Sequence, residues 1–273
     1  MPNIKFSGTI KNRYTYLVFG EIEDMNPKEL QEKLEQYLRL ESFPLGFKFV
    51  KSEEELPEKF RRADDLTICQ AYNISRRYGW TMFFDRNTTC PIGLVAYGFT
   101  KPDELYESGE LAYDAGYAIN REIGRKFEEA IVKLNESYLG CLVAPLRRME
   151  RVDFVVVYGN PAQILRLVHA TLYDVGGAFE TRILGRGACT EFLEAFVHKK
   201  PRLVLPCYGD RLFGLTQDHE IAFAFPFEMS EKIVRNLEET HRRGIRYPIP
   251  TTALRLKLIL PESYEKSAEN MKK

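Results

Sequence analysis

The chain has 273 residues, of which 44% are hydrophobic and 29% are charged, a composition typical of a globular protein with a buried core. Lys plus Arg equals Asp plus Glu at 39 each, so no overall positive charge would attract nucleic acid or an anionic membrane. The N-terminal residues lack a signal peptide's apolar segment, and no window reaches the roughly 20 apolar residues that cross a bilayer. We therefore expect a cytoplasmic protein that binds neither nucleic acid nor membranes.

The N-terminal region predicts a short extension ahead of the main body. Residues 14–20 are apolar enough to form a strand, and residues 27–40 repeat apolar side chains with the period of an amphipathic helix. We assign both to an extension over residues 1–40. A further strand is expected at Leu45–Val50, followed by an acidic helix over residues 52–60.

Two cysteines bracket the next helix–strand unit. The pattern predicts a helix over residues 70–78 and a strand over residues 80–84, with Cys69 before the helix and Cys90 after the strand. Pro91 follows Cys90 directly and would fix the turn beside its sulfur. The two thiols would then lie at the ends of one small unit, where they could meet.

A second unit repeats this order later in the chain. Cys189 precedes a helical stretch, and Cys207 follows the short strand pattern RLVL. A strong strand at residues 153–159 comes before this unit. It leads into a helix that Asn160 and Gln163 are expected to cap through reciprocal hydrogen bonds.

The repeated order predicts an α/β (α+β) fold made of two related halves, residues 41–138 and 139–250, packed as one globular body. An amphipathic helix after each unit, from Asn120 and from Ser230, supports a duplication. Residues 251–273 would add a final strand and a polar, frayed tail. A pseudo-twofold relation between the halves would bring the cysteines of both units to their interface.

Converging cysteines predict a metal or cluster site. In a reducing cytosol, cysteines are better interpreted as ligands or reactive thiols than as disulfides. Soft thiolates suit zinc or an iron–sulfur cluster, and isolated ligands from distant elements favour a [4Fe–4S] cluster over zinc. The expected metal and cofactor ligands are Cys69, Cys90, Cys189 and Cys207. Buried structural thiols, or one nucleophilic or redox thiol, are the alternatives, and the fifth cysteine, Cys141, is expected in the core.

Two arginines near the thiols are candidates for binding a small anionic substrate. Arg186 lies three residues before Cys189, and Arg211 lies four residues after Cys207 in a polar segment. A guanidinium can hold a carboxylate or phosphate through two hydrogen bonds. The alternatives are that Arg186 covers apolar neighbours with its stem, and that Arg211 forms surface ion pairs in a turn with Asp210.

Several stretches together resemble one protein family. They are ICQA, CPIG, YGNPAQ, GRGACTE, LPCYGDRLFGLTQDHEIAFAFP and RGIRYPIP. The chain looks like the domain of unknown function family 169, which comprises soluble, mainly archaeal and bacterial proteins of undetermined role. The likeness covers roughly residues 40–250. It implies that Cys69, Cys90, Cys189 and Cys207 belong to the family pattern and Cys141 does not, and it implies no activity.

The sequence therefore predicts an iron–sulfur protein whose reaction depends on the ligand count. Four cysteine ligands would suit electron transfer with a redox partner protein, or a structural role of the cluster. Three would leave one iron open for Lewis-acid chemistry on a small anionic substrate. The alternatives are a metal-free small-molecule binding protein and an accessory subunit of a redox complex. A homo-oligomer is compatible with each of these hypotheses.

Overall fold

The computed structural model describes residues 25–135, 137–250 and 260–272. The strands are β1 (Leu45–Val50), β2 (Arg61–Arg62), β3 (Met82–Phe84), β4 (Gly140–Pro145), β5 (Phe154–Gly159), β6 (Arg202–Val204) and β7 (Ile221–Pro226). The helices are α1 (Pro27–Leu38), α2 (Ile68–Tyr78), α3 (Pro91–Ala96), α4 (Glu104–Ser108), α5 (Glu110–Asp114), α6 (Arg121–Ala130), α7 (Pro161–Leu172), α8 (Ala188–His198), α9 (Tyr208–Gly214), α10 (Ser230–Arg242) and α11 (Glu262–Met271). Short 3-10 helices are η1 (Glu53–Glu55), η2 (Leu146–Arg148) and η3 (Phe227–Met229). The expected N-terminal strand, and all but the last residue of the expected final strand, lie outside the described residues.

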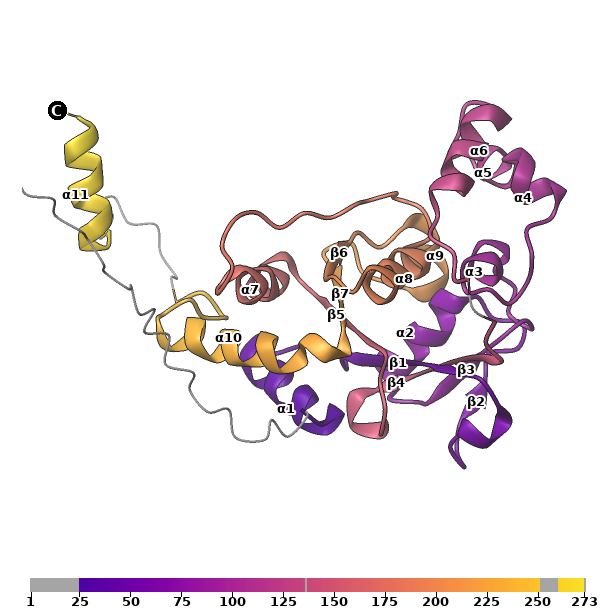
Figure 1. The fold of residues 1–273 in the computed structure, drawn as a ribbon, viewed down its shortest axis with the longest axis horizontal. Helices are drawn as coiled ribbons and strands as arrows, with labels where there is room; N and C mark the ends of the chain where they lie inside the picture. The colour runs from indigo at the N-terminus through magenta and orange to yellow at the C-terminus, as the bar shows by residue number, and fades with distance from the viewer. Residues whose placement is uncertain (1–24, 136, 251–259, 273) are drawn as a thin grey trace, which may run out of the picture.

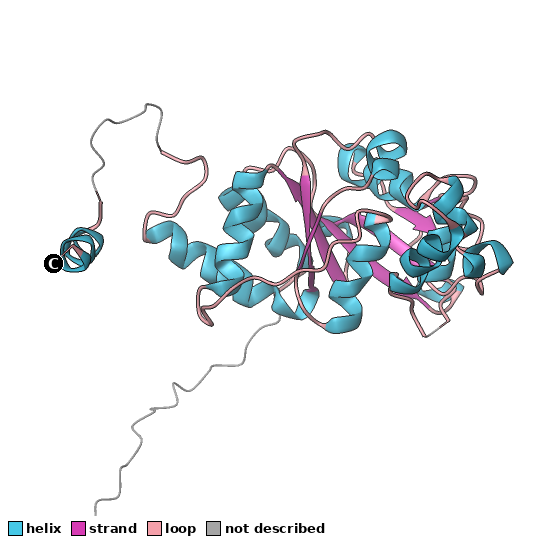
Figure 2. Ribbon diagram, turned by 90° about the horizontal axis from the view of Figure 1, so that it is seen from above, coloured by secondary structure: helices cyan, strands magenta, loops and turns pink. Residues whose placement is uncertain are grey.

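The described strands form one mixed sheet in the order β2-β3-β4-β1-β5-β7-β6. Helices cover both of its faces (Figures 1 and 2), so the predicted mixed α/β class is confirmed. Side chains of β5 alternate between the two sides, as a strand buried on both faces requires. Phe154 and Val156 join the core beneath α2, α3 and α8, whereas Val155 and Val157 join the core beneath α1, α7 and α10.

Apart from the edge strand β2, the two sides of the sheet have similar strand orders when they are followed outward from the adjacent pair β1 and β5. β1, β4 and β3 follow one another on one side, and β5, β7 and β6 follow on the other. β1 and β5 are antiparallel, with Leu45 opposite Val156. A duplicated unit would produce this order, and the descent of the two halves from one unit stays a prediction. β4 pairs with both β1 and β3, although the boundary expected at residue 139 assigned it to the second half.

Two local expectations differ from the structure. Residues 52–60 form only the exposed turn η1 rather than an acidic helix, because three adjacent glutamates repel one another and Pro57 lacks an amide donor. The tail is helical rather than frayed, as α11. Its residues are exposed, and a Lys266–Glu262 ion pair one turn apart supports it.

Helices α4, α5 and α6 form a separate unit, called here the α4–α6 unit (residues 104–130). These helices pack on one another and stand beside α3 at one end of the molecule (Figure 1). Gly109, at φ +82°, and Gly124 allow a close crossing, because a Cβ on Gly124 would lie 2.1 Å from the Gly109 carbonyl oxygen. In contrast, α10 packs on α7 and α1. The amphipathic helices expected after each unit therefore occupy unrelated places.

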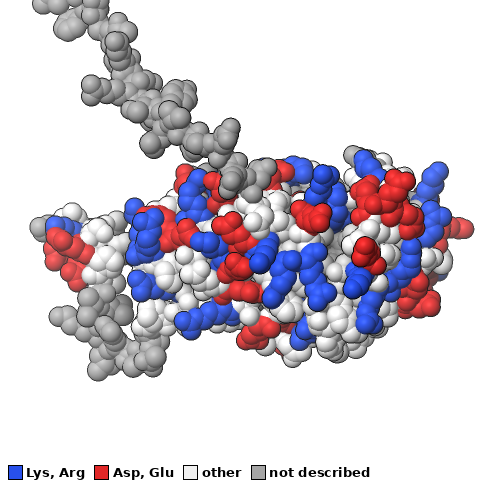
Figure 3. All heavy atoms as spheres, turned by 90° about the horizontal axis from the view of Figure 1, so that it is seen from below, with Lys and Arg blue, Asp and Glu red and all other residues white. Residues whose placement is uncertain are grey.

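Charges of both signs are interspersed on the face of the molecule that Figure 3 shows, and neither sign forms a continuous field there. Among the helices of the described segments, none combines the length and the apolar character needed to cross a membrane.

Candidate functional site

The structure brings four cysteines to one cavity of about 280 Å³, which all four thiols line. Each of the four belongs to the start of a different helix. Cys69 and Cys189 are the second residues of α2 and α8, and Cys90 and Cys207 are the N-caps of α3 and α9. Residues that are up to 138 positions apart in the sequence thus share one site.

Local capping chemistry explains why α3 and α9 begin at a thiol. The Cys90 sulfur accepts a hydrogen bond from the Gly93 amide, and the Cys207 sulfur accepts one from the Asp210 amide, each at 3.4 Å. These sulfurs replace the oxygen of an ordinary N-cap residue. In α2 the cap is Thr67, whose hydroxyl oxygen lies 3.0 Å from the Cys69 sulfur.

The surroundings of the thiols shift their pKa values in different directions. A hydrogen bond from the Cys189 thiol, helped by the Gly93 amide and the positive charge of Arg186, lowers the pKa of Cys90 to about 7. The same hydrogen bond, together with burial, raises the pKa of Cys189. Burial raises the pKa of Cys69 to about 12. In the metal-free site, Cys90 is therefore the thiol that loses its proton more readily, and Cys189 keeps its proton.

This arrangement predicts a selective alkylation in the metal-free, reduced protein. Iodoacetamide should modify Cys90 with a rate that rises through a midpoint at about pH 7, because only the thiolate is nucleophilic. Cys69, with its pKa of about 12, should react far more slowly over the same range. Peptide mass spectrometry after timed quenching gives both rates. A midpoint for Cys90 at or above about 8.5, the value for an ordinary thiol, would contradict the assignment.

One charged group of the cavity accepts hydrogen bonds from the protein at both of its oxygens. Asp210 is fully buried, and its carboxylate accepts hydrogen bonds from the Tyr72 hydroxyl at 2.8 Å, the Asn73 amide at 2.8 Å and the Tyr158 hydroxyl at 2.9 Å. Burial raises the pKa of Asp210, although these donors oppose that change. Asp210 therefore ties α9 to α2 and β5 beneath the thiols.

The other charged group of the cavity, Arg186, is buried with spare capacity. Its Nη1 lies 2.5 Å from Oε1 of Glu128, which α6 supplies, and both side chains are at most 3% exposed. Its guanidinium also lies over the Tyr117 ring, 5.3 Å from the centroid. Arg186 Nε and Glu128 Oε2 are buried without a hydrogen-bond partner among the described residues.

The remaining sequence candidates lie elsewhere. Arg211 does not line the cysteine cavity, because its guanidinium donates to the carbonyl oxygens of Gln217 and Glu220 in its own segment. Asp210, expected in a surface turn, is instead a fully buried residue of α9. Cys141 is buried in β4 and lies outside the cavity lining, in the core as expected.

Sequence reasoning missed three residues at the site. Tyr72 lies one helical turn after Cys69 on α2, a spacing that could have revealed it. Glu128 and Tyr117 belong to the α4–α6 unit, and no local pattern connects them to the cysteines. Their place was decided by packing.

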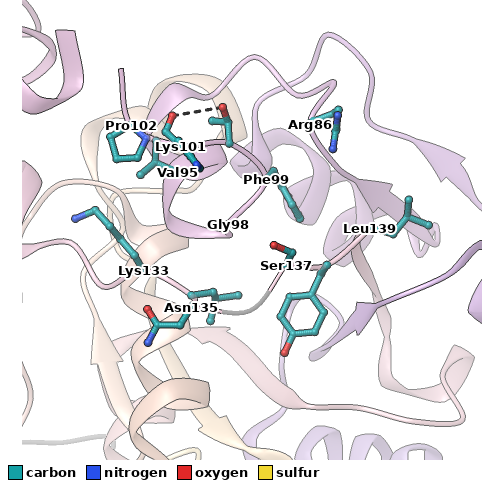
Figure 4. A pocket seen from close by; sticks show the side chains of 13 residues that line it. Arg86, Val95, Gly98, Phe99, Lys101, Pro102, Lys133, Asn135, Ser137 and Leu139 are labelled. Atoms are coloured by element: carbon teal, nitrogen blue, oxygen red, sulfur yellow. Dashed lines mark hydrogen bonds between the residues drawn. The ribbon is translucent and has the colours of Figure 1, made fainter. Parts of the chain in front are cut away.

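A larger hollow of about 530 Å³ lies at the far end of α3. Its charged side chains do not converge, since Figure 4 shows Arg86 and Lys133 on opposite sides. Lys133 also donates to the carbonyl oxygens of Glu128 and Ile131. The smaller cysteine cavity, with its convergent polar groups, is the better candidate for chemistry.

The thiols do not form a ready-made site for one metal ion. Within residues 25–135, 137–250 and 260–272, no group of three or more His, Cys, Asp or Glu side chains stands close enough to hold such an ion. Four sulfurs around zinc would lie about 3.8 Å apart, given Zn–S bonds of about 2.3 Å. A [4Fe–4S] cluster binds each thiolate at a different iron, so its ligands are spaced more widely.

Comparisons with known proteins agree with the resemblance seen in the sequence. Residues 33–236 match the model of DUF169, described as uncharacterised ArCR. The uncharacterised protein MJ0308 of Methanocaldococcus jannaschii is 30% identical over 218 residues, which cover 77% of this chain and 93% of that relative. No solved structure matches the chain. The matched region contains the four cysteines of the cavity and Arg186. The chain therefore belongs to the DUF169 family.

Proposed function

We propose that Cys69, Cys90, Cys189 and Cys207 bind a [4Fe–4S] cluster in their shared cavity. The observation that carries the proposal is that four thiols, from four separate helix starts, line one cavity of about 280 Å³. A set of structural thiols would have no reason to meet at one hollow, whereas cluster ligands must do so.

The surroundings of the thiols support an anionic cluster. The Gly93 and Asp210 amides already donate to two of the sulfurs, and such hydrogen bonds tune the potential of a cluster. The helices α2 and α8, each of 11 residues, direct their positive N-terminal ends to the other two cysteines. Arg186 adds a buried positive charge to the cavity wall.

The ligand count decides the role of the cluster. With four thiolate ligands, each iron is coordinated by the protein, and the site suits one-electron transfer to a partner protein. With three, one iron is open to a small anionic substrate. Cys90 and Cys189 affect each other's pKa values. Ligation therefore most needs a test at the other two thiols, Cys69 and Cys207.

The first measurement is a visible spectrum of anaerobically purified protein, with iron, zinc and sulfide quantified on the same sample. We expect a brown protein with a broad absorption shoulder near about 400 nm and roughly four irons and four sulfides per chain. A colourless protein without iron after anaerobic reconstitution, or one that retains only zinc, would contradict the cluster.

A second candidate function is thiol–disulfide exchange, favoured by the lowered pKa of Cys90 and by the presence of Cys189 in the same cavity wall. The Cys90 thiolate would attack a substrate disulfide, forming a mixed disulfide and releasing one substrate thiolate. Cys189, after giving its proton to the first released thiolate, would attack the Cys90 sulfur and release the second thiolate. The protein dithiol is then oxidised and the substrate disulfide reduced. Metal-free protein treated with oxidised glutathione should lose two hydrogens in mass, with the bond mapped to this pair.

A further inference from the structure

We propose that the cysteine cavity also binds a small monocarboxylate with an apolar body, and that Arg186 holds the carboxylate group. The inference rests on the proposed function in that both use this cavity, and it names the substrate class of that site. Apart from the thiols, the cavity wall has several wholly apolar side chains. They include Pro91, Ile92, Leu111, Ala115 and Phe213.

The charges of the cavity wall select the sign of the ligand. Besides the thiols, the wall has Asp210 and Arg186 as ionisable residues, and Asp210 already accepts three hydrogen bonds. Arg186 keeps a buried Nε without an acceptor in the described part of the chain. Because a buried donor without a partner is unfavourable, a ligand oxygen at this position gains the interaction that the protein leaves unmade.

The guanidinium geometry selects the carboxylate class. Glu128 occupies Nη1 of Arg186, which leaves the edge formed by Nε and Nη2 without an acceptor among the described residues. Two parallel N–H groups on one edge match the two oxygens of a carboxylate. A phosphate dianion would bring a second negative charge that no other cation of the wall compensates, and burying such a charge is costly.

The α4–α6 unit forms the part of the cavity wall next to Arg186. It supplies Leu111, Ala115 and Tyr117 to the wall, and Glu128 to the guanidinium. Its helices pack chiefly on one another. The Glu128–Arg186 ion pair, together with a hydrogen bond from Arg182 to the Ala130 carbonyl oxygen at 2.6 Å, joins the unit to the segment before α8. The ligand would lie between this unit and the thiols, and Glu128 would share the guanidinium with it.

Two variants separate this binding role from a structural role of Arg186. Arg186→Gln removes the charge and should weaken carboxylate binding by about tenfold or more. Glu128→Gln removes a like charge from the same guanidinium and should tighten binding by about tenfold. Arg211→Gln is the matched control, because Arg211 lies outside the cavity wall, and it should change binding by less than about twofold.

The test is a ligand-observed NMR titration of the full chain with butyrate, using neutral butyramide for comparison. It is run on the protein as isolated anaerobically and on the same protein stripped of metal. Butyrate should bind to at least one of these forms, and butyramide should bind far more weakly. Equal binding of the two compounds, or no tightening in Glu128→Gln, would overturn the inference even if Arg186→Gln fails to fold. Metal analysis of the same samples decides the cluster independently.

Discussion

Replacing Cys207 with alanine is expected to remove most of the iron that the chain takes up during anaerobic reconstitution, and Cys90→Ala should do the same. Each variant deletes one thiol of the shared cavity, and a cluster with an unfilled ligand position is exposed to loss. Iron, sulfide and the visible spectrum, measured per folded chain, report the effect. Cys90 and Cys207 come from the two different halves predicted for the chain, residues 41–138 and 139–250, so a common loss would tie both halves to one site.

Cys141→Ala is the matched control for these variants. Its thiol is fully buried in β4 and does not line the cavity, so iron uptake should equal that of the unmodified chain. The same assay on Cys69→Ala and Cys189→Ala determines the ligand count. Full iron uptake by one of the four variants would identify a three-cysteine site with an open iron, and full uptake by all four would refute cysteine ligation.

Arg76→Met is expected to destabilise the fold by about 3–5 kcal/mol, because it leaves a buried carboxylate without its main partner. The Arg76 side chain is 0% exposed, and its Nη1 and Nη2 lie 2.5 Å and 2.9 Å from the Glu220 oxygens. Its guanidinium also stacks 4.0 Å from the centroid of Tyr158. Chemical denaturation, fitted with a common slope, measures the loss in the free energy of unfolding.

The neighbouring residue provides an internal control for this prediction. Arg77 contacts the same carboxylate of Glu220 at 3.3 Å, but its side chain is 33% exposed. Water compensates much of that interaction, so Arg77→Met should cost only about 0–1 kcal/mol. Equal losses in the two variants would mean that burial of the ion pair is not what makes Arg76 important. The comparison matters for the site because Arg76 also bonds Asn73, which donates to Asp210 beside the thiols.

The sequence predicted many local elements well because their signals are local. Asn160 and Gln163 form the expected reciprocal cap of α7, and this pattern needs only four consecutive residues. Apolar runs predicted β1 and β5 for the same reason. The helix predicted over the acidic residues 52–60 was wrong, because a helix without an apolar face gains no stability from burial.

The spacing of the cysteines pointed to one shared site, because two similar units imply two similar positions in space. The sequence could not show that Cys90 and Cys189, 99 residues apart, would line the same cavity. That arrangement depends on how α3 and α8 pack on the same face of the sheet. Strand order depends on such long-range burial in the same way, and β4 accordingly lies between β3 and β1.

The sequence by itself therefore determined the family, the capped start of α7 and the four cysteines worth testing. Only the tertiary structure decided which polar groups surround those cysteines. In the tertiary structure, Asp210 accepts three hydrogen bonds and Arg211 donates to carbonyl oxygens of its own segment. Glu128 forms an ion pair with Arg186. The physical reason is that caps and hydrophobic periods act over a few residues, whereas a buried charge is placed by whichever distant group can satisfy it.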